Sequence, residues 1–158
     1  MKRLLKPRKR LLLILKESPQ REQLMAILSG MGFWIDYETD MKTALEKFKH
    51  YRHPVVFVDE EELPKKSARL FSLFYKIQQN VAVVCMVKPE RRGLVYTYLA
   101  HGAWDVITIP LRTKEVVPKV RRLLERYELS STTVYFQYLL LFSWFLFTIW
   151  FLILGKLI

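Results

Sequence analysis

The sequence has 158 residues, 51% of them hydrophobic, and it carries a formal net charge of +11 at pH 7. This length allows one ordinary domain with an appended segment, and the charge suits an anionic membrane surface or nucleic acid. A single cysteine excludes an internal disulfide. The sequence contains no Walker-type phosphate loop and no Gly-x-Ser-x-Gly elbow, so we do not expect an enzyme.

Residues 1–10 form a basic N-terminal segment with six cationic side chains: Lys2, Arg3, Lys6, Arg8, Lys9 and Arg10. Such a cluster is typical of a solvated surface that helps to set membrane topology, and it also suits contact with anionic lipid. Nucleic acid is the third possible partner and the least favoured of the three.

Residues 11–127 alternate between apolar runs and amphipathic stretches, a pattern that predicts a parallel sheet with helices on both faces. The predicted strands are 11–15, 33–38, 54–61, 81–87 and 104–109, and the predicted helices are 18–32, 41–51, 67–79, 91–102 and 113–127. Pro118 falls about one turn into the last helix. Either one backbone hydrogen bond is lost there, or the regular helix begins nearer Pro118.

The polar residues 128–133 are expected to form a short linker to an apolar run. Residues 134–155 contain no charged side chain, and these 22 residues at about 1.5 Å each are long enough to cross a membrane. We expect a single transmembrane helix followed by a short tail at 156–158, which makes the chain tail-anchored. Tyr135 and Tyr138 fall at the predicted membrane interface.

All but one of the 26 Lys and Arg residues precede this span, Lys156 being the exception. The positive-inside rule therefore predicts a single-pass protein with its N-terminal domain in the cytoplasm, as at a bacterial inner membrane.

The carboxyl ends of parallel strands meet at one edge of the sheet, which is where sites form in such folds. Lys16 and Glu17 follow the first predicted strand, Asp59 follows the third, Val87 ends the fourth and Ile109 ends the fifth. We expect these five residues to lie close together.

Three stretches, LLILKESP, PVVFVD and GAWDVITIPL, resemble the response regulator receiver (CheY-like) domain family over about residues 8–127. The resemblance implies a flavodoxin-like α/β fold. It also implies an acidic pair at positions 16 and 17, where this sequence has Lys16 and Glu17, and a phosphoacceptor Asp at Asp59. The family's hydroxyl residue falls on Val87, and its lysine falls on Ile109. Only Glu17 and Asp59 keep the family's residue type, and Val106 replaces its aromatic switch residue, so the resemblance is to a degenerate member.

Lys16 brings a positive charge to the place where the family binds Mg²⁺, and this opposes metal binding if the side chain points inward. We hypothesise that Lys16 pairs with Asp59 or Glu17. Asp59 then either caps a loop or pairs with Lys16; phosphorylation of Asp59 and attraction of a cation by Glu17 and Asp59 are the alternatives. Val87 and Ile109 offer no hydrogen-bond donor to a phosphoryl group.

We therefore expect a membrane-anchored, degenerate receiver-like domain that acts by binding a protein, as an accessory subunit of a larger membrane complex, without a cofactor. Within residues 91–127, Tyr96, Tyr98 and Trp104 are the candidate contacts. The alternatives are a phosphorylatable response regulator that uses Asp59 with Mg²⁺, and a basic tether for nucleic acid.

His50, His53 and His101 have no cysteine or acid at a zinc-ligand spacing, so we expect surface positions for them and no metal site. Cys85 lies in an apolar run and is expected to be a buried, inert thiol.

Overall fold

The computed structural model of the chain describes residues 9–63 and 67–155. Most of the expected basic segment, up to Arg8, and the tail at 156–158 lie outside these residues. The described part contains a five-stranded parallel sheet with the order β2-β1-β3-β4-β5. The strands are β1 (Arg10–Ile14), β2 (Trp34–Glu38), β3 (Val55–Asp59), β4 (Ala82–Val87) and β5 (Asp105–Thr108). The predicted sheet is confirmed.

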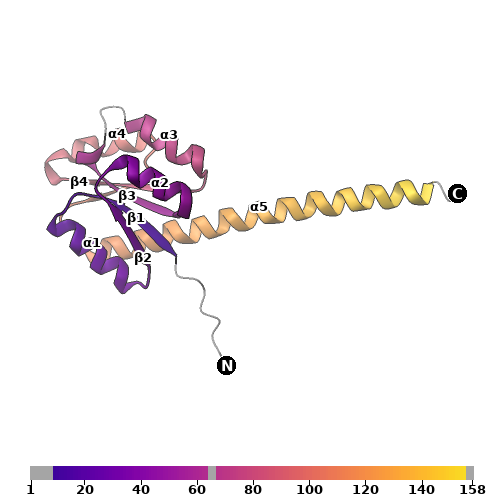
Figure 1. Cartoon of the computed structure of the whole chain (residues 1–158), viewed down its shortest axis with the longest axis horizontal. Coiled ribbons are helices and arrows are strands. Elements are labelled where there is room, and N and C mark those ends of the chain that lie inside the picture. The colour runs from indigo at the N-terminus through magenta and orange to yellow at the C-terminus, as the bar shows by residue number, and fades with distance from the viewer. Residues whose placement is uncertain (1–8, 64–66, 156–158) are drawn as a thin grey trace, which may run out of the picture.

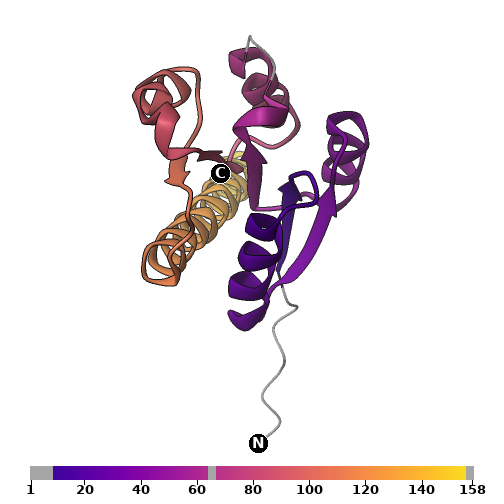
Figure 2. The same ribbon diagram turned by 90° about the vertical axis from the view of Figure 1, so that its left-hand side faces the viewer.

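Five helices cover the sheet on both faces (Figures 1 and 2). They are α1 (Pro19–Gly30), α2 (Met41–Tyr51), α3 (Ser67–Ile77), α4 (Val95–Ala100) and α5 (Thr113–Gly155), and two short 3-10 helices, η1 (Glu60–Glu62) and η2 (Pro89–Leu94), follow β3 and β4. Helices α1 and α5 pack on one face of the sheet, and α2, α3 and α4 pack on the other.

The two-residue period of a strand divides the core between these faces. Leu11, Leu13 and Leu15 point toward α1 and α5, whereas Leu12 and Ile14 point toward α2 and α3. All five side chains are fully buried. A strand buried on both faces explains why the sequence reads as a continuous apolar run instead of an alternating one.

The helix predicted at 91–102 is shorter and less regular than expected. Residues Pro89–Leu94 form the 3-10 helix η2, in which Arg91 leaves helical geometry, and only Val95–Ala100 are α-helical. Neither segment contains a fully buried residue. Helical stability comes mostly from packing of an apolar face, and Gly93 is a poor helix former. The segment therefore lacks the interactions that would make it a regular α-helix.

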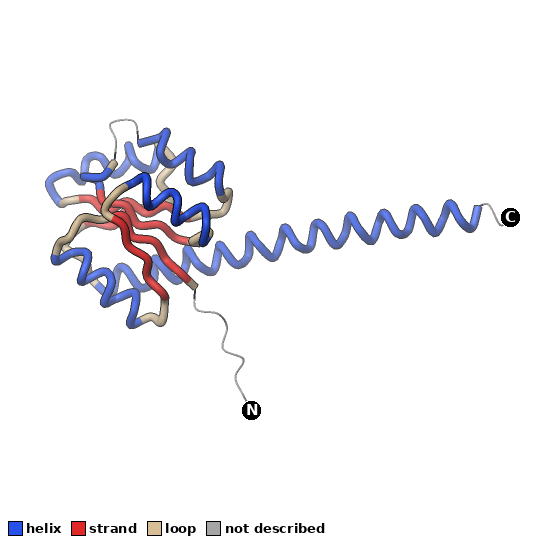
Figure 3. The backbone as a smooth tube through the Cα atoms, viewed as in Figure 1, coloured by secondary structure: helices blue, strands red, loops and turns tan. Residues whose placement is uncertain are grey.

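The expected linker at 128–133 is helical. Helix α5 runs without interruption through 43 residues from Thr113 to Gly155 and includes Pro118 (Figure 3). Residues 128–133 contain neither glycine nor proline, so their preference against a helix is weak, and the Thr133 hydroxyl bonds back to the carbonyl of Leu129. Helix propagation from both sides therefore carries through the segment.

Beyond the globular part, α5 is the one helix of the described residues that is long and apolar enough to cross a membrane. Its most apolar window has a mean hydropathy of 1.6, and none of that window is buried against the rest of the chain. A core helix of a soluble domain would bury such a face. Tyr135 and Tyr138, the expected interfacial residues, are both largely exposed on this helix.

Candidate functional site

The carboxyl ends of the strands surround an open hollow of about 430 Å³. Its lining contains four of the five residues expected to meet there, Lys16, Glu17, Asp59 and Ile109, together with Ser18, Gln20, Glu61, Lys88, Pro89 and Glu90. Val87 ends β4 but does not line the hollow. The strand-end rule therefore predicted which residues meet at this edge of the sheet for four of the five, while the contacts among them differ from those expected.

Lys16 does not pair with Asp59 or Glu17, so that hypothesis is wrong. Its ammonium nitrogen lies 2.9 Å from Glu62 Oε1, and 66% of the side chain is exposed. The 3-10 turn η1 brings Glu62 across the edge of the sheet to meet Lys16. The hydrogen bond and charge of Glu62 raise the pKa of Lys16, so this residue keeps its positive charge at neutral pH.

Glu17 also points away from the acceptor position. Its carboxylate accepts a hydrogen bond of 3.0 Å from Arg21 one helical turn further on, and 85% of its side chain is exposed. The retained acid is thus engaged with a cation of its own at the start of α1. It does not form an acidic pair with Asp59.

Asp59 is half-buried and acts as the N-cap of η1, where its Oδ1 accepts a 3.2 Å hydrogen bond from the backbone N–H of Glu61. The expected loop-capping role of Asp59 is confirmed. Burial raises the pKa of the Asp59 carboxyl above its ordinary value, and the Glu61 N–H opposes that change.

Val87 and Ile109 lie on opposite faces of the sheet. Val87 is fully buried in the cluster beneath α2 and α3, and Ile109 is almost fully buried in the cluster beneath α1 and α5. Val106, at the position of the family's aromatic switch residue, is also buried. All three therefore act as core residues, and none presents a hydrogen-bond donor to the hollow.

The sequence analysis missed a second set of charged residues. The backbone N–H of Lys88 donates a 3.1 Å hydrogen bond to the buried carboxylate of Glu60, and the Lys88 ammonium group pairs with Glu61. These contacts join the turn after β3 to the turn after β4. The acidic run at 59–62 and a lysine directly after an apolar strand were the available signals.

The residues of the hollow do not fit a magnesium ion. Mg²⁺ needs carboxylates that converge on one point, whereas here Asp59 caps η1 and three glutamates are directed to separate cations. Glu17 pairs with Arg21, Glu61 with Lys88 and Glu62 with Lys16. Among the described residues, no group of three or more His, Cys, Asp or Glu side chains has a metal-binding arrangement.

The three aromatic residues expected at an interaction face lie in different surroundings. Tyr96 on α4 is 83% exposed, whereas Tyr98 packs against the core. Trp104, just before β5, is 38% exposed and lies beneath the guanidinium group of Arg126, 4.4 Å from its ring centroid. Of the three expected residues, Tyr96 is therefore the one that is available for contact on α4, and Trp104 belongs to another part of the surface.

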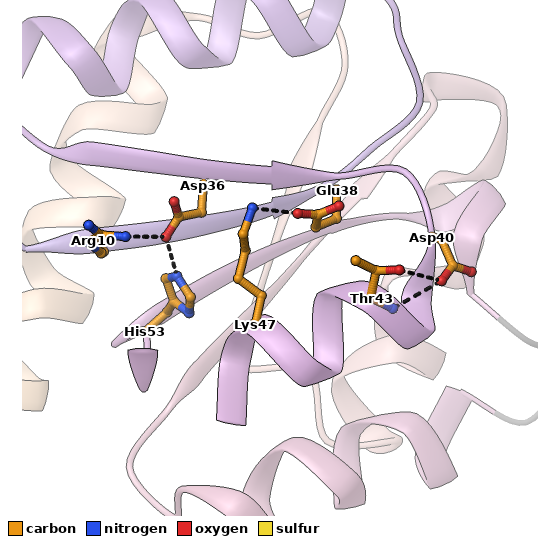
Figure 4. A network of polar contacts seen from close by, with 7 residues as sticks. All are labelled: Arg10, Asp36, Glu38, Asp40, Thr43, Lys47 and His53. Atoms are coloured by element: carbon orange, nitrogen blue, oxygen red, sulfur yellow. Dashed lines mark hydrogen bonds and ion pairs between the residues drawn. The ribbon is translucent and has the colours of Figure 1, made fainter. Parts of the chain in front are cut away.

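The surface position expected for His53 is wrong. This imidazole is fully buried, and its Nε2 lies 2.8 Å from Asp36 Oδ2 (Figure 4). Arg10 approaches the same carboxylate oxygen at 3.5 Å. Asp36 is in the edge strand β2 and His53 is in the loop before β3, so this pair forms only when the two segments come together in the fold. The sequence around each residue gave no sign of the contact.

The expected burial of Cys85 is confirmed. The thiol is fully buried in β4, and burial raises its pKa to about 12. His50 is exposed, while His101 is partly buried and its Nδ1 lies 2.7 Å from the Ser67 hydroxyl.

No family model and no curated protein sequence matches the chain. Solved structures do match. NtrX from Brucella abortus in complex with ADP is 21% identical over 80% of this chain, with a TM-score of 0.71, and the match spans 28% of NtrX. The receiver domain of TorR, a response regulator of the TMAO respiratory system, is 18% identical over 75% of this chain and 98% of its own, with a TM-score of 0.66.

A CheY-like protein, tadZ from Pseudomonas aeruginosa PAO1, is 18% identical over 73% of this chain and 98% of its own, with a TM-score of 0.61. These likenesses establish the fold. The chain has the flavodoxin-like fold of a CheY-like receiver domain, and its long apolar α5 extends beyond that fold.

Proposed function

We propose that this chain is a membrane-anchored, degenerate receiver-like domain that works by binding another protein, as a non-catalytic accessory subunit in signalling at the cytoplasmic face of a membrane. One observation carries the proposal. At the strand ends where a receiver would bind metal and phosphoryl group, Lys16 is paired with Glu62, and Val87 and Ile109 are buried in the core.

Phosphoryl transfer to a carboxylate requires cations that neutralise both the incoming phosphoryl group and the acceptor. The cations that line the hollow with Asp59 are Lys16 and Lys88, and each is already paired with a glutamate. A phosphoryl group on Asp59 would have to break these pairs, and it would meet no hydroxyl at position 87. The site therefore favours a fixed surface over a phosphorylation cycle.

The anchoring half of the proposal rests on α5. Large apolar side chains on its carboxyl half are exposed on all sides, including Leu140, Phe142, Trp144 and Phe147. A helix that is apolar all round and unburied needs lipid or other apolar helices around it. The excess of basic residues before this segment supports a cytoplasmic domain.

The partner-binding half rests on the surface of η2 and α4. Leu94, Tyr96 and Leu99 are all exposed there, and the segment buries no residue fully. Exposed aromatic and aliphatic side chains on one short element are typical of a protein contact.

Phosphorylation of Asp59 is the alternative, and the open hollow beside this carboxylate favours it. The two functions are separated by incubating the full chain with acetyl phosphate and Mg²⁺ and measuring its intact mass. We expect no added phosphoryl group. An adduct that disappears in Asp59→Asn would establish the alternative instead.

The accessory role is tested by extraction in mild detergent, followed by identification of the chains that co-purify. We expect a defined partner with the wild-type chain and much less of it with Tyr96→Ala. The matched control is Tyr37→Ala, which removes an exposed tyrosine from β2. Recovery of the wild-type chain alone would contradict an accessory role.

A further inference from the structure

The direction in which α5 leaves the domain distinguishes one end of the sheet from the other. In this fold the strands run one way and the helices return, so the amino ends of the strands and the carboxyl ends of the helices share one end of the domain. Helix α5 leaves from that end (Figure 1). We call this end of the domain the proximal end. It contains the first residues of β1 and β2, Arg10 and Trp34, together with Trp104 just before β5 and Tyr51 at the end of α2.

Among the described residues, the proximal end has three cations that lie over aromatic rings. Arg10 lies 4.3 Å from the ring centroid of Tyr51, Arg126 lies 4.4 Å from that of Trp104, and Lys9 lies 5.9 Å from that of Tyr127. Trp34 adds a ring that is 58% exposed. Amphipathic rings beside Lys and Arg are the composition found at the level of lipid headgroups.

A second open hollow, of about 370 Å³, lies at this end between α5 and the turns before β4 and β5. Polar groups from Gln79, Asn80, Arg126, Ser130 and Thr133 line it. The lining ends at Thr133, directly before the charge-free run that begins at residue 134. The hollow therefore opens beside the first residues of the apolar segment.

Arg126 is eight residues before this run, which along an α-helix is about 12 Å. The headgroup layer on each side of a bilayer is about 5–8 Å thick. The backbone of Arg126 therefore lies about 4–7 Å outside the headgroup layer. The hollow itself extends along α5 from Arg126 down to Thr133, so it overlaps the layer in which lipid phosphates lie.

We propose that this hollow binds the phosphate of an anionic phospholipid of the membrane that holds α5, with Arg126 as the main contact. The inference rests on the proposed membrane anchoring. Among the described residues no ion pair involves Arg126, and stacking on Trp104 holds its planar group in place. A guanidinium group held in this way can donate two parallel hydrogen bonds to one phosphate.

Neighbouring acids do not compete for Arg126. Glu128 pairs with Lys9, and Asp105, next to Trp104 in the chain, pairs with Lys119. The proximal end thus keeps an uncompensated cation facing the anionic lipid layer. Lipid bound here would hold this end of the domain against the membrane and direct the Asp59 hollow, at the opposite end of the strands, away from the bilayer.

The test uses the full chain in detergent micelles with equal amounts of phosphatidylglycerol and phosphatidylcholine, and native mass spectrometry counts the lipid retained. We expect the wild type to retain phosphatidylglycerol preferentially. Arg126→Gln should lower that retention about tenfold, since a charge-assisted pair is lost. Arg126→Lys, which keeps the charge without the planar fork, should fall between the two.

Arg121→Gln is the matched control, because Arg121 is exposed on the same helix and does not line the hollow. Equal losses in Arg126→Gln and Arg121→Gln, or no loss in Arg126→Gln, would overturn the inference. Displacement of the lipid by millimolar inorganic phosphate would also overturn it, since the site would then bind soluble anions.

Flotation with vesicles of phosphatidylcholine alone tests the anchoring separately. If the chain floats with these vesicles but shows no preference for phosphatidylglycerol, the lipid site fails and the anchoring stands. If the chain does not float, the anchoring fails and the lipid site falls with it.

Discussion

The ammonium nitrogen of Lys16 lies 2.9 Å from the carboxylate of Glu62, so the lysine that follows β1 is held by the 3-10 turn after β3. This pair fixes the charge of the hollow without involving Asp59. It also leaves Asp59 free to cap η1. The contact thus joins the loop after β1 to the turn after β3.

Replacing this lysine by an acid should restore metal affinity. In Lys16→Asp, a carboxylate takes the place of an ammonium group at the edge of the hollow that contains Asp59, and Glu62 loses its cationic partner. We expect Mg²⁺ to bind at least about tenfold more tightly than to the wild type, because a repulsive charge becomes an attractive one. Isothermal titration of the full chain in detergent measures this.

Lys76→Asp serves as the control for that titration, since Lys76 is exposed near the end of α3 and the change in net charge is the same. Equal Mg²⁺ affinity in the wild type and Lys16→Asp would show that charge at position 16 does not govern the hollow.

Restoring the family's hydroxyl should cost stability. Val87 is fully buried among apolar side chains, so the hydroxyl of Val87→Thr would have to enter that cluster. Burying an unpaired hydroxyl costs about 1–3 kcal/mol, and we expect the free energy of unfolding to fall by that amount. Urea unfolding followed by tryptophan fluorescence measures it. Val95→Thr, at a partly buried position, should change it much less; equal costs would contradict a buried role for Val87.

His53 should make the domain less stable in mild acid. Burial lowers its pKa from the ordinary 6.5; the Asp36 carboxylate opposes this, and Arg10 and Lys47 add to it. The unfolded chain therefore takes up a proton at a higher pH than the folded chain. The free energy of unfolding should fall as the pH drops below about 6.5, and the fall should end below the pKa of the folded state.

Urea midpoints of the full chain at pH 7.5 and pH 5.5 measure this effect. His53→Gln, which keeps a hydrogen-bonding group facing Asp36, should flatten the difference between the two midpoints. His50→Gln, at an exposed position, should leave it unchanged. A wild-type midpoint that stays constant or rises in acid would contradict the effect.

The fold was predictable because it depends on period and order. Leu11–Leu15 and the run at 81–87 are apolar without alternation, and amphipathic helices separate them, which leaves a parallel sheet as the consistent arrangement. The strand-end rule then brought Lys16, Asp59 and Ile109 to one hollow. These are properties of the backbone and of burial.

The partners within the site were not predictable in the same way. Lys16 pairs with Glu62 and His53 with Asp36, and both contacts depend on side-chain direction and on turns that have no periodic signal. The helical state of residues 128–133 was missed for a related reason. Polar residues suggest a linker by composition, but continuity with a helix on each side decides their conformation.

Gly102 opens the stretch GAWDVITIPL with a backbone φ of +106°, a conformation that side chains disfavour. A Cβ there would lie 3.7 Å from both Phe71 Cβ and Tyr75 Cε2, which are ordinary contacts, so the cost of Gly102→Ala comes from the backbone. We expect the free energy of unfolding to fall by about 1–2 kcal/mol. The carbonyl of Gly102 also accepts a 2.6 Å hydrogen bond from the Tyr75 hydroxyl, so relaxation of the turn would disturb the end of α3.

Gly93→Ala is the matched change, because Gly93 lies in η2 without a positive φ and nothing lies within 4 Å of its added Cβ. That variant should unfold at the wild-type urea concentration or slightly above it, since alanine reduces the freedom of the unfolded chain. Urea unfolding of both variants under one set of conditions makes the comparison. Equal midpoints for Gly102→Ala and Gly93→Ala would show that the turn before β5 relaxes without cost, and that the start of this strand does not depend on a left-handed residue.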